Sequence, residues 1–256
     1  MIALPECFLR LPIAHRALHD VAQGRQENSI SAIQAAIDAD YAIEIDIQMS
    51  KDGHAMVFHD YDLGRLTFKS GAVLQHTKDQ LVEFRLKNCN ETIPTFAQVL
   101  SLVAGRVPLL VEIKDQDGIM GHETGPLERA IAADLQGYAG DVAVMSFNPH
   151  SVAWMKRLLP NIPRGLTTGP FRSGDWVLLP TAVKQRLRKI PDFERFGASF
   201  ISHNVRDLKN SRVSEIKGKG CPVLCWTVKD EATEMVARRI ADNITFEGYL
   251  AKHLPT

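Results

Sequence analysis

The feature that most constrains the fold is a regular alternation of short apolar segments with longer amphipathic ones along the 256 residues. The short segments are rich in β-branched residues and have strand length. Eight of them lie at 11–15, 42–49, 108–114, 142–147, 162–168, 200–204, 222–228 and 243–246. Strands separated by helices favour a parallel sheet. Because a (β/α)8 barrel takes about 250 residues, we predict an α/β fold in which residues 1–256 form a single TIM-barrel domain.

One stretch departs from this alternation. Residues 55–58 form a short returning strand after the turn Lys51-Asp-Gly53, and the residues that follow are irregular and polar. Helical spacing resumes at 93–104, before the next barrel strand. We therefore predict a small insertion after the second strand, at about residues 60–92, above the mouth of the barrel.

Carboxylates occur on the second predicted strand in an informative pattern. Glu44 and Asp46 alternate with isoleucines, so the two acids share one face of the strand. The isoleucines suit the outer face, which packs on helices, and the acids therefore point inward. Glu112 joins them from a neighbouring strand. Because three crowded carboxylates repel one another, a divalent cation would stabilise them, and an all-oxygen set suits Mg²⁺, Ca²⁺ or Mn²⁺ better than Zn²⁺.

Histidines and cations end the same strands, where barrel active sites gather. His15 and His59 can divide acid and base work near neutral pH. Arg16 and Lys114, beside these groups, provide the charge and donors that a phosphate needs. The alternative is that the acids and bases form a structural ion-pair network. We expect the remaining histidines to be surface or loop residues: 19, 54, 76, 122, 150, 203 and 253.

Together these residues resemble the glycerophosphodiester phosphodiesterase family, whose motifs appear in family order from about residue 13 to the end. The motifs are His15-Arg16, Glu27-Asn28-Ser29, Glu44-Ile-Asp46, Lys51-Asp-Gly53, His59-Asp60, Ile93-Pro-Thr95, Glu112-Ile-Lys114, Ser146-Phe147-Asn148-Pro149 and Trp226-Thr227-Val228. The resemblance implies a TIM barrel with a small insertion after the second strand. Each motif alone is weak, and the ordered set is specific.

The resemblance also implies roles for single residues. The general acid and base would be His15 and His59. One divalent cation, Mg²⁺ or Ca²⁺, would be held by Glu44, Asp46 and Glu112. The phosphate would contact Arg16 and Lys114, and the pocket near the glycerol or the leaving group would be lined by Phe147 and Trp226.

The reaction that the resemblance implies is hydrolysis of glycerophosphodiesters to an alcohol and sn-glycerol 3-phosphate. The glycerol hydroxyl beside the ester attacks phosphorus, and water opens the resulting cyclic phosphate. The chain departs from the family pattern at Ala17, Gln26, Gly64, Lys229 and Phe246-Glu247. None of these departures removes a candidate ligand or histidine, and the last two leave the identity of the alcohol open.

Three other functions remain open. A phospholipase D-like enzyme acting on lysophospholipids or sphingomyelin would need an apolar groove. The insertion offers five apolar residues that could form either such a groove or a local core: Leu63, Leu66, Phe68, Val73 and Leu74. A sugar-phosphate isomerase or aldolase barrel would use strand-end acids, with Lys114 as a possible Schiff-base residue. A non-catalytic binding protein is disfavoured because the whole His/His/Glu/Asp/Glu set is present.

Charge and hydropathy limit the partners. The 30 basic and 30 acidic residues balance, whereas nucleic-acid binders usually carry a basic surplus. The N-terminus lacks the features of a signal peptide, and no apolar run approaches the roughly 20 residues of a membrane span. We expect a small-molecule phosphodiester as the ligand, no nucleic acid, no stable membrane insertion and a cytoplasmic location. The oligomeric state is left open.

Overall fold

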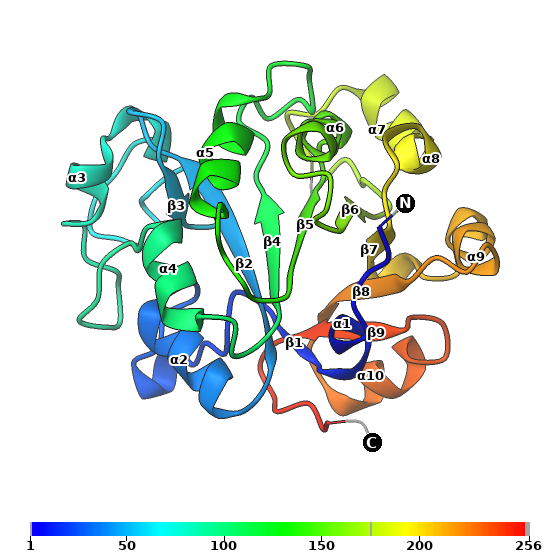
Figure 1. Ribbon diagram of the computed structural model, residues 1–256, viewed down its shortest axis with the longest axis horizontal. Coiled ribbons are helices and arrows are strands. Elements are labelled where there is room, and N and C mark those ends of the chain that lie inside the picture. Colours follow the sequence, from blue (N-terminus) through cyan, green and yellow to red (C-terminus); the bar gives the residue numbers. More distant parts are fainter. Residues whose placement is uncertain (1, 175, 254–256) are drawn as a thin grey trace.

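Eight parallel strands close into a barrel in the computed structural model, which describes residues 2–174 and 176–253. The ring closes because the first strand pairs with both the second and the last. The strands are β1 (Ile13–Ala14), β2 (Ala42–Met49), β4 (Leu109–Ile113), β5 (Val142–Ser146), β6 (Arg164–Thr168), β7 (Phe200–Asn204), β8 (Val223–Val228) and β9 (Asn243–Phe246). A ninth strand, β3 (Ala55–Val57), pairs antiparallel with β2 outside the ring (Figure 1). The predicted (β/α)8 fold is confirmed.

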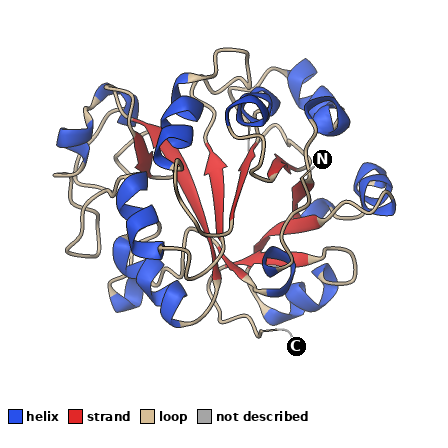
Figure 2. Cartoon of the chain, in the orientation of Figure 1, coloured by secondary structure: helices blue, strands red, loops and turns tan. Residues whose placement is uncertain are grey.

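Helices surround the strands on the outside of the barrel (Figure 2). The α-helices between strands are α2 (Ile30–Asp38), α4 (Phe96–Val103), α5 (Pro126–Asp134), α6 (Pro149–Leu158), α7 (Thr181–Leu187), α8 (Asp192–Phe196), α9 (Ser211–Gly218) and α10 (Glu231–Ala237). Short 3-10 turns are η1 (Val21–Gln23) and η3 (Val205–Asp207). Side-chain caps start helices α2 and α4. Ser29 accepts a hydrogen bond from Ala32 N at the start of α2, and Thr95 accepts one from Gln98 N at the start of α4. Up to residue 253, no helix follows β9.

The alternation along β2 fixes which side chains reach the barrel interior. Ile43, Ile45 and Ile47 are fully buried in the layer shared with the surrounding helices. Burial of each such side chain stabilises the fold by about 1.5–3 kcal/mol. Since neighbours on a strand face opposite ways, Glu44 and Asp46 point into the barrel, where they are almost completely buried.

The opposite end of the barrel is closed by apolar side chains. The short helix α1 (Cys7–Arg10) buries Phe8 there, in a cluster with Leu110, Phe200 and Leu224. The ring of Phe200 lies so close to Gly165 that a Cβ on this glycine would approach it to 2.3 Å. The interior is therefore apolar at this end, and the polar groups gather at the C-terminal mouth.

The insertion has a small core of its own. Its elements are η2 (Val73–Gln75) and α3 (Lys78–Leu81), and its buried side chains include Leu63, Leu66 and Val73. The predicted insertion is present, but it is less polar inside than the sequence suggested. Three of the five side chains considered for an acyl-chain groove are used in this core, and Phe68 and Leu74 are exposed.

One histidine is placed differently from the prediction. His203 lies on β7 and is fully buried, with Nδ1 2.8 Å from Thr168 Oγ1 and Nε2 3.1 Å from Asp207 Oδ2. The expectation that it is a surface or loop residue is wrong, because both ring nitrogens find partners within the fold.

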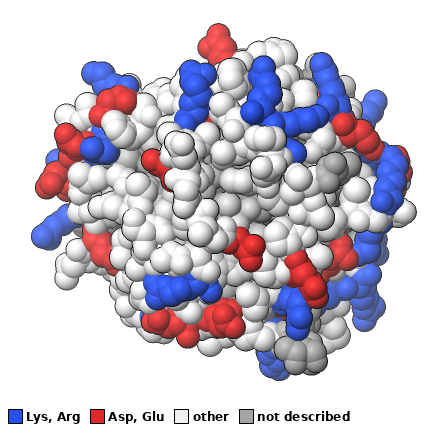
Figure 3. All heavy atoms as spheres, in the orientation of Figure 1, with Lys and Arg blue, Asp and Glu red and all other residues white. Residues whose placement is uncertain are grey.

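The outer surface carries both signs of charge. On the face drawn in Figure 3, Lys and Arg side chains lie interspersed with Asp and Glu, mostly around the rim. None of the helices in the described part of the chain is long and apolar enough to cross a membrane.

Candidate active site

A small cavity of about 80 Å³ opens at the C-terminal mouth of the barrel. All the residues that the sequence singled out line it: His15, Arg16, Glu44, Asp46, His59, Glu112, Lys114, Phe147 and Trp226. Met145, Thr227 and Thr245 complete the lining. Residues separated by more than two hundred positions are thus brought together by the closure of the barrel.

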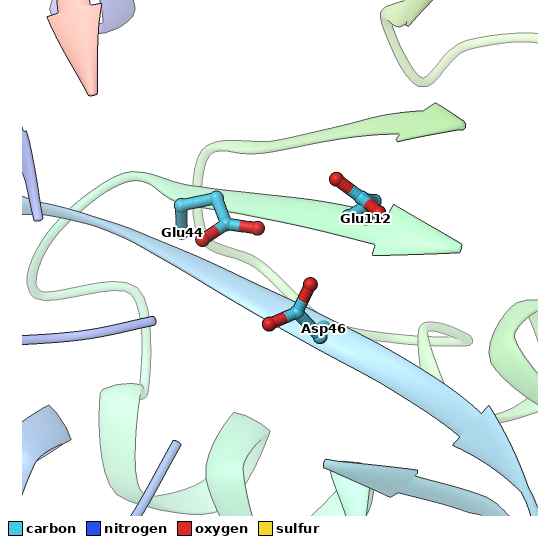
Figure 4. A group of neighbouring side chains, drawn as sticks. All are labelled: Glu44, Asp46 and Glu112. Atoms are coloured by element: carbon cyan, nitrogen blue, oxygen red, sulfur yellow. The ribbon is translucent and has the colours of Figure 1, made fainter. Parts of the chain in front are cut away.

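Three carboxylates form the floor of this cavity. One oxygen from each of Glu44, Asp46 and Glu112 lies within 4.8 Å of the others. Asp46 on β2 is in register with Glu112 on β4, which explains why two neighbouring strands deliver acids to one point. Figure 4 shows the three carboxylates gathered between these strands. All three side chains are buried.

The positive charge beside these acids is insufficient to balance them. Lys114 Nζ lies 2.8 Å from Asp46 Oδ1 and 2.5 Å from Glu112 Oε1. Glu44 accepts a hydrogen bond from the backbone N of Arg16 at 2.8 Å. Burial, and then repulsion by Asp46 and Glu112, raise the pKa of Glu44 well above its ordinary value. The cluster therefore favours an additional cation.

The donor set fits a divalent metal ion. Carboxylate oxygens are the ligands that Mg²⁺ and Ca²⁺ prefer, and a bound cation would remove the repulsion that raises the pKa of Glu44. Asn28 orients one of these ligands, because its Nδ2 donates to Asp46 Oδ2 at 2.9 Å and its Oδ1 accepts from Asp46 N at 3.3 Å. Such outer partners hold metal ligands in place.

His15 is positioned by the carboxylate of Glu247, which follows the last barrel strand. Its Nδ1 lies 2.5 Å from Oε2 of Glu247, just after β9. The other oxygen of Glu247 lies 2.6 Å from Lys229 Nζ. Burial lowers the pKa of His15 below its usual value, although Glu247 acts in the opposite direction. With Nδ1 occupied, Nε2 is the ring nitrogen left for the cavity.

His59 has the same arrangement with a different carboxylate. Its Nδ1 lies 2.6 Å from Asp60 Oδ1. Arg65, from the insertion, donates to both oxygens of Asp60 at 2.6 and 2.8 Å. Although burial opposes the effect, hydrogen bonds from Arg65 and His59 hold the pKa of Asp60 well below its ordinary range.

Arg65 also connects this histidine to the phosphate-binding candidate Arg16. It donates to both oxygens of Glu27 at 2.8 Å, and Glu27 accepts a further hydrogen bond from Arg16 NH1 at 2.8 Å. The buried Nε of Arg16 forms an ion pair with Asp46, 3.6 Å from its Oδ2, but makes no hydrogen bond within the described residues. This donor fits an anionic ligand in the cavity.

Aromatic side chains form one wall. The rings of Phe147 and Trp226 meet edge to face with centroids 5.4 Å apart, and Trp226 Nε1 donates to Ser202 O at 3.0 Å. An apolar wall therefore lines the same cavity as the acids.

Several residues of the site received no role from the sequence. Glu27 and Asn28 belong to one of the motifs, and Glu247 to a departure from the family pattern, but none of them has a predicted role, and Arg65 belongs to no motif. Their roles depend on contacts such as His15 with Glu247, 232 positions apart, and no local pattern reveals such a pairing.

Comparisons with known proteins agree with this geometry. The model of the glycerophosphoryl diester phosphodiesterase family matches residues 15–246. A glycerophosphodiester phosphodiesterase of Caldanaerobacter subterraneus subsp. tengcongensis is 33% identical over 165 residues, which are 61% of this chain and 65% of that protein. YhdW of Bacillus subtilis is 27% identical over 231 residues, which are 86% of this chain and 87% of YhdW. The chain thus spans slightly less than two thirds of the first of these relatives.

A solved structure gives the same fold. An Oleispira antarctica phosphodiesterase, in complex with its product sn-glycerol-3-phosphate, superposes with a TM-score of 0.74 over 93% of each chain at 23% identity. Since the family model matches most of the chain, from the first candidate histidine to the last barrel strand, this protein belongs to the glycerophosphoryl diester phosphodiesterase family.

Proposed function

We propose that this protein is a metal-dependent phosphodiesterase that hydrolyses glycerophosphodiesters to an alcohol and sn-glycerol 3-phosphate. The observation that carries the proposal is the joint lining of one cavity by two carboxylate-paired histidines, three clustered acids and two cations. The product bound to the Oleispira antarctica relative supports the choice of substrate. We assign the whole of residues 1–256 to this one domain.

The binding groups have separate tasks. Glu44, Asp46 and Glu112 would hold one Mg²⁺ or Ca²⁺ ion. When bound, this ion supplies a positive charge that lowers the pKa of a nearby hydroxyl. Arg16 and Lys114 neutralise the phosphate oxygens and stabilise the charge that grows on them as phosphorus is attacked. Both metals accept carboxylate ligands, so the three acids suit either one.

The histidines exchange the protons. One imidazole accepts the proton of the glycerol hydroxyl next to the ester as its oxygen attacks phosphorus, and the other protonates the departing alcohol oxygen. This step forms a cyclic phosphate and releases the alcohol. In the second step the roles reverse: water is deprotonated and attacks phosphorus, and the ring-opening oxygen is protonated. Glu247 and Asp60 keep Nδ1 of each ring occupied, so that Nε2 acts.

The aldolase alternative has less support. A Schiff-base lysine must be an uncharged amine, but Nζ of Lys114 lies between the carboxylates of Asp46 and Glu112. These partners stabilise the charged ammonium group.

The test is to assay release of sn-glycerol 3-phosphate by the metal-loaded protein and by His15→Ala and His59→Ala. We expect each substitution to lower kcat by at least about 100-fold, the usual contribution of general acid–base catalysis. The control is His54→Ala, at a half-exposed histidine outside the cavity, which should retain wild-type turnover. Unchanged turnover in either cavity variant would remove that histidine from the mechanism.

A further inference from the structure

A second and much larger cavity opens beside the catalytic one. Its volume is about 790 Å³, against about 80 Å³ for the catalytic cavity. The two share His59, Glu112, Lys114, Phe147, Trp226 and Thr227. The larger one is called the side cavity below. It is too large for the glycerol phosphate portion alone, and its size is that of sites which enclose whole organic ligands, about 300–1,000 Å³.

The walls of the side cavity are mainly apolar and are built from loops at the barrel mouth. Phe147 follows β5, and Phe171 and Trp176 lie between β6 and α7. The ring of Phe147 lies 4.8 Å from that of Trp176 and 6.1 Å from that of Phe171, measured between centroids. Met120, Phe171 and Leu179, which line the side cavity, are buried in a local core together with Leu187.

Two large apolar side chains on the same wall face water. Val177 and Leu178 line the side cavity and are 79% and 78% exposed. Adjacent exposed apolar side chains at the mouth of a cavity are typical of ligand-binding surfaces. Covering them with an apolar group would remove this area from water, which is favourable.

The way the two cavities divide the site decides which part of the substrate each accepts. The catalytic cavity contains His15, Arg16, Glu44 and Asp46, none of which lines the side cavity. The attacking glycerol hydroxyl must lie among these acids, so the glycerol arm of the phosphodiester occupies the catalytic cavity. The second ester arm therefore extends from the phosphate past His59 and Lys114, which line both cavities, into the side cavity.

We infer that the side cavity binds an apolar chain on the leaving alcohol, so that glycerophosphodiesters of long-chain alcohols are better substrates than those of short ones. The inference rests on the proposed function and names the class of its substrate. It places the chain on the alcohol that departs and not on the glycerol that keeps the phosphate.

The experiment measures kcat/KM of the metal-loaded protein for sn-glycerol 3-phosphate esters of ethanol, butanol and octanol, below their micellar concentrations. We expect kcat/KM to rise at least tenfold from the ethyl to the octyl ester. The double variant Val177→Ser/Leu178→Ser should lose several-fold more kcat/KM on the octyl ester than on the ethyl ester. The matched control is Phe68→Ser, since Phe68 is an apolar side chain that is 75% exposed on the insertion and lines neither cavity. It should keep the wild-type chain-length profile.

Three outcomes would overturn the inference. Equal kcat/KM for all esters would mean that the side cavity does not contact the alcohol, while hydrolysis of the ethyl ester would still support the proposed function. A preference for an ethyl ester whose glycerol carries an octanoyl chain, over the octyl ester, would move the apolar chain to the glycerol arm. Absence of hydrolysis of every ester would overturn the proposed function itself.

Discussion

Glu247 is the residue whose position changes the interpretation of this site most. Lys229 and Phe246-Glu247 are two of the positions at which the sequence departs from the family pattern. In the structure Lys229 and Glu247 form an ion pair, and Glu247 also forms a hydrogen bond with Nδ1 of His15. The hydrogen bond from His15 holds the pKa of Glu247 well below its usual range. Its contacts with His15 and Lys229 therefore favour the charged form of this carboxylate.

We predict that Glu247→Gln lowers kcat and displaces the pH profile. Glu247 raises the pKa of His15, in opposition to burial. Its loss therefore lowers that pKa, and the limb of the kcat/KM profile that reports on His15 moves to lower pH. The direction is the same whether His15 acts in its neutral or its protonated form. Glu231→Gln, at an exposed glutamate of α10, is the control. If both limbs stay in place, Glu247 does not tune His15.

At the residue scale, the sequence was most informative where one strand carried the signal. Glu44 and Asp46 share a face because side chains alternate along a strand, and both line the cavity at the mouth of the barrel. Partners such as Glu247 and Arg65 come from distant segments, and only barrel closure and the packing of the insertion bring them to the histidines. Pairing across such distances leaves no periodicity in the sequence.

The insertion is the element that links the surroundings of His59 to those of Arg16. Its Arg65 binds Asp60, the partner of His59, and Glu27, the partner of Arg16. The insertion thus contacts the partners of both a candidate catalytic histidine and a candidate phosphate-binding arginine.

We predict that Arg65→Lys lowers kcat/KM for glycerophosphodiesters by about tenfold or more, as loss of an outer partner does in other sites. Lysine keeps the charge but not the planar group that bonds two carboxylates at once. Arg85→Lys, at an exposed arginine of the same insertion, should keep wild-type activity. Wild-type kcat/KM in Arg65→Lys would show that the insertion does not position the site.

Strand prediction succeeded best where burial imposes a clear pattern. The predicted bounds of β2, β7 and β9 match those observed, 42–49, 200–204 and 243–246. β1 is only Ile13–Ala14, shorter than the predicted 11–15. The sequence left open whether the apolar residues of the insertion form a groove or a local core, because they follow neither the helical nor the strand period, and Leu63, Leu66 and Val73 lie in a local core.

At the scale of the whole molecule, the barrel is apolar at one end and densely charged at the other. The apolar end supports the fold, and the acids at the mouth oppose it through their burial and mutual repulsion. A ligand that neutralises these acids should therefore stabilise the entire barrel.

We predict that Mg²⁺ or Ca²⁺ at 100 times its Kd raises Tm by about 5–10 °C. Binding at this level contributes about 2.7 kcal/mol, and a protein of this size gains about 2–4 °C per kcal/mol. Thermal unfolding followed by circular dichroism measures the shift. Glu112→Gln should reduce it, whereas Glu123→Gln, an exposed residue before α5, should not. A Tm independent of either metal would argue that Lys114 and Arg16 alone balance the acids.

One titration shows whether the acidic cluster binds a metal that phosphodiester hydrolysis requires. The protein is exhaustively chelated, and release of sn-glycerol 3-phosphate from a glycerophosphodiester is followed as Mg²⁺ or Ca²⁺ is added back. We predict almost no turnover in the chelated protein and recovery with at least one of the two ions. Full turnover after chelation, with no response to either ion, would contradict the account.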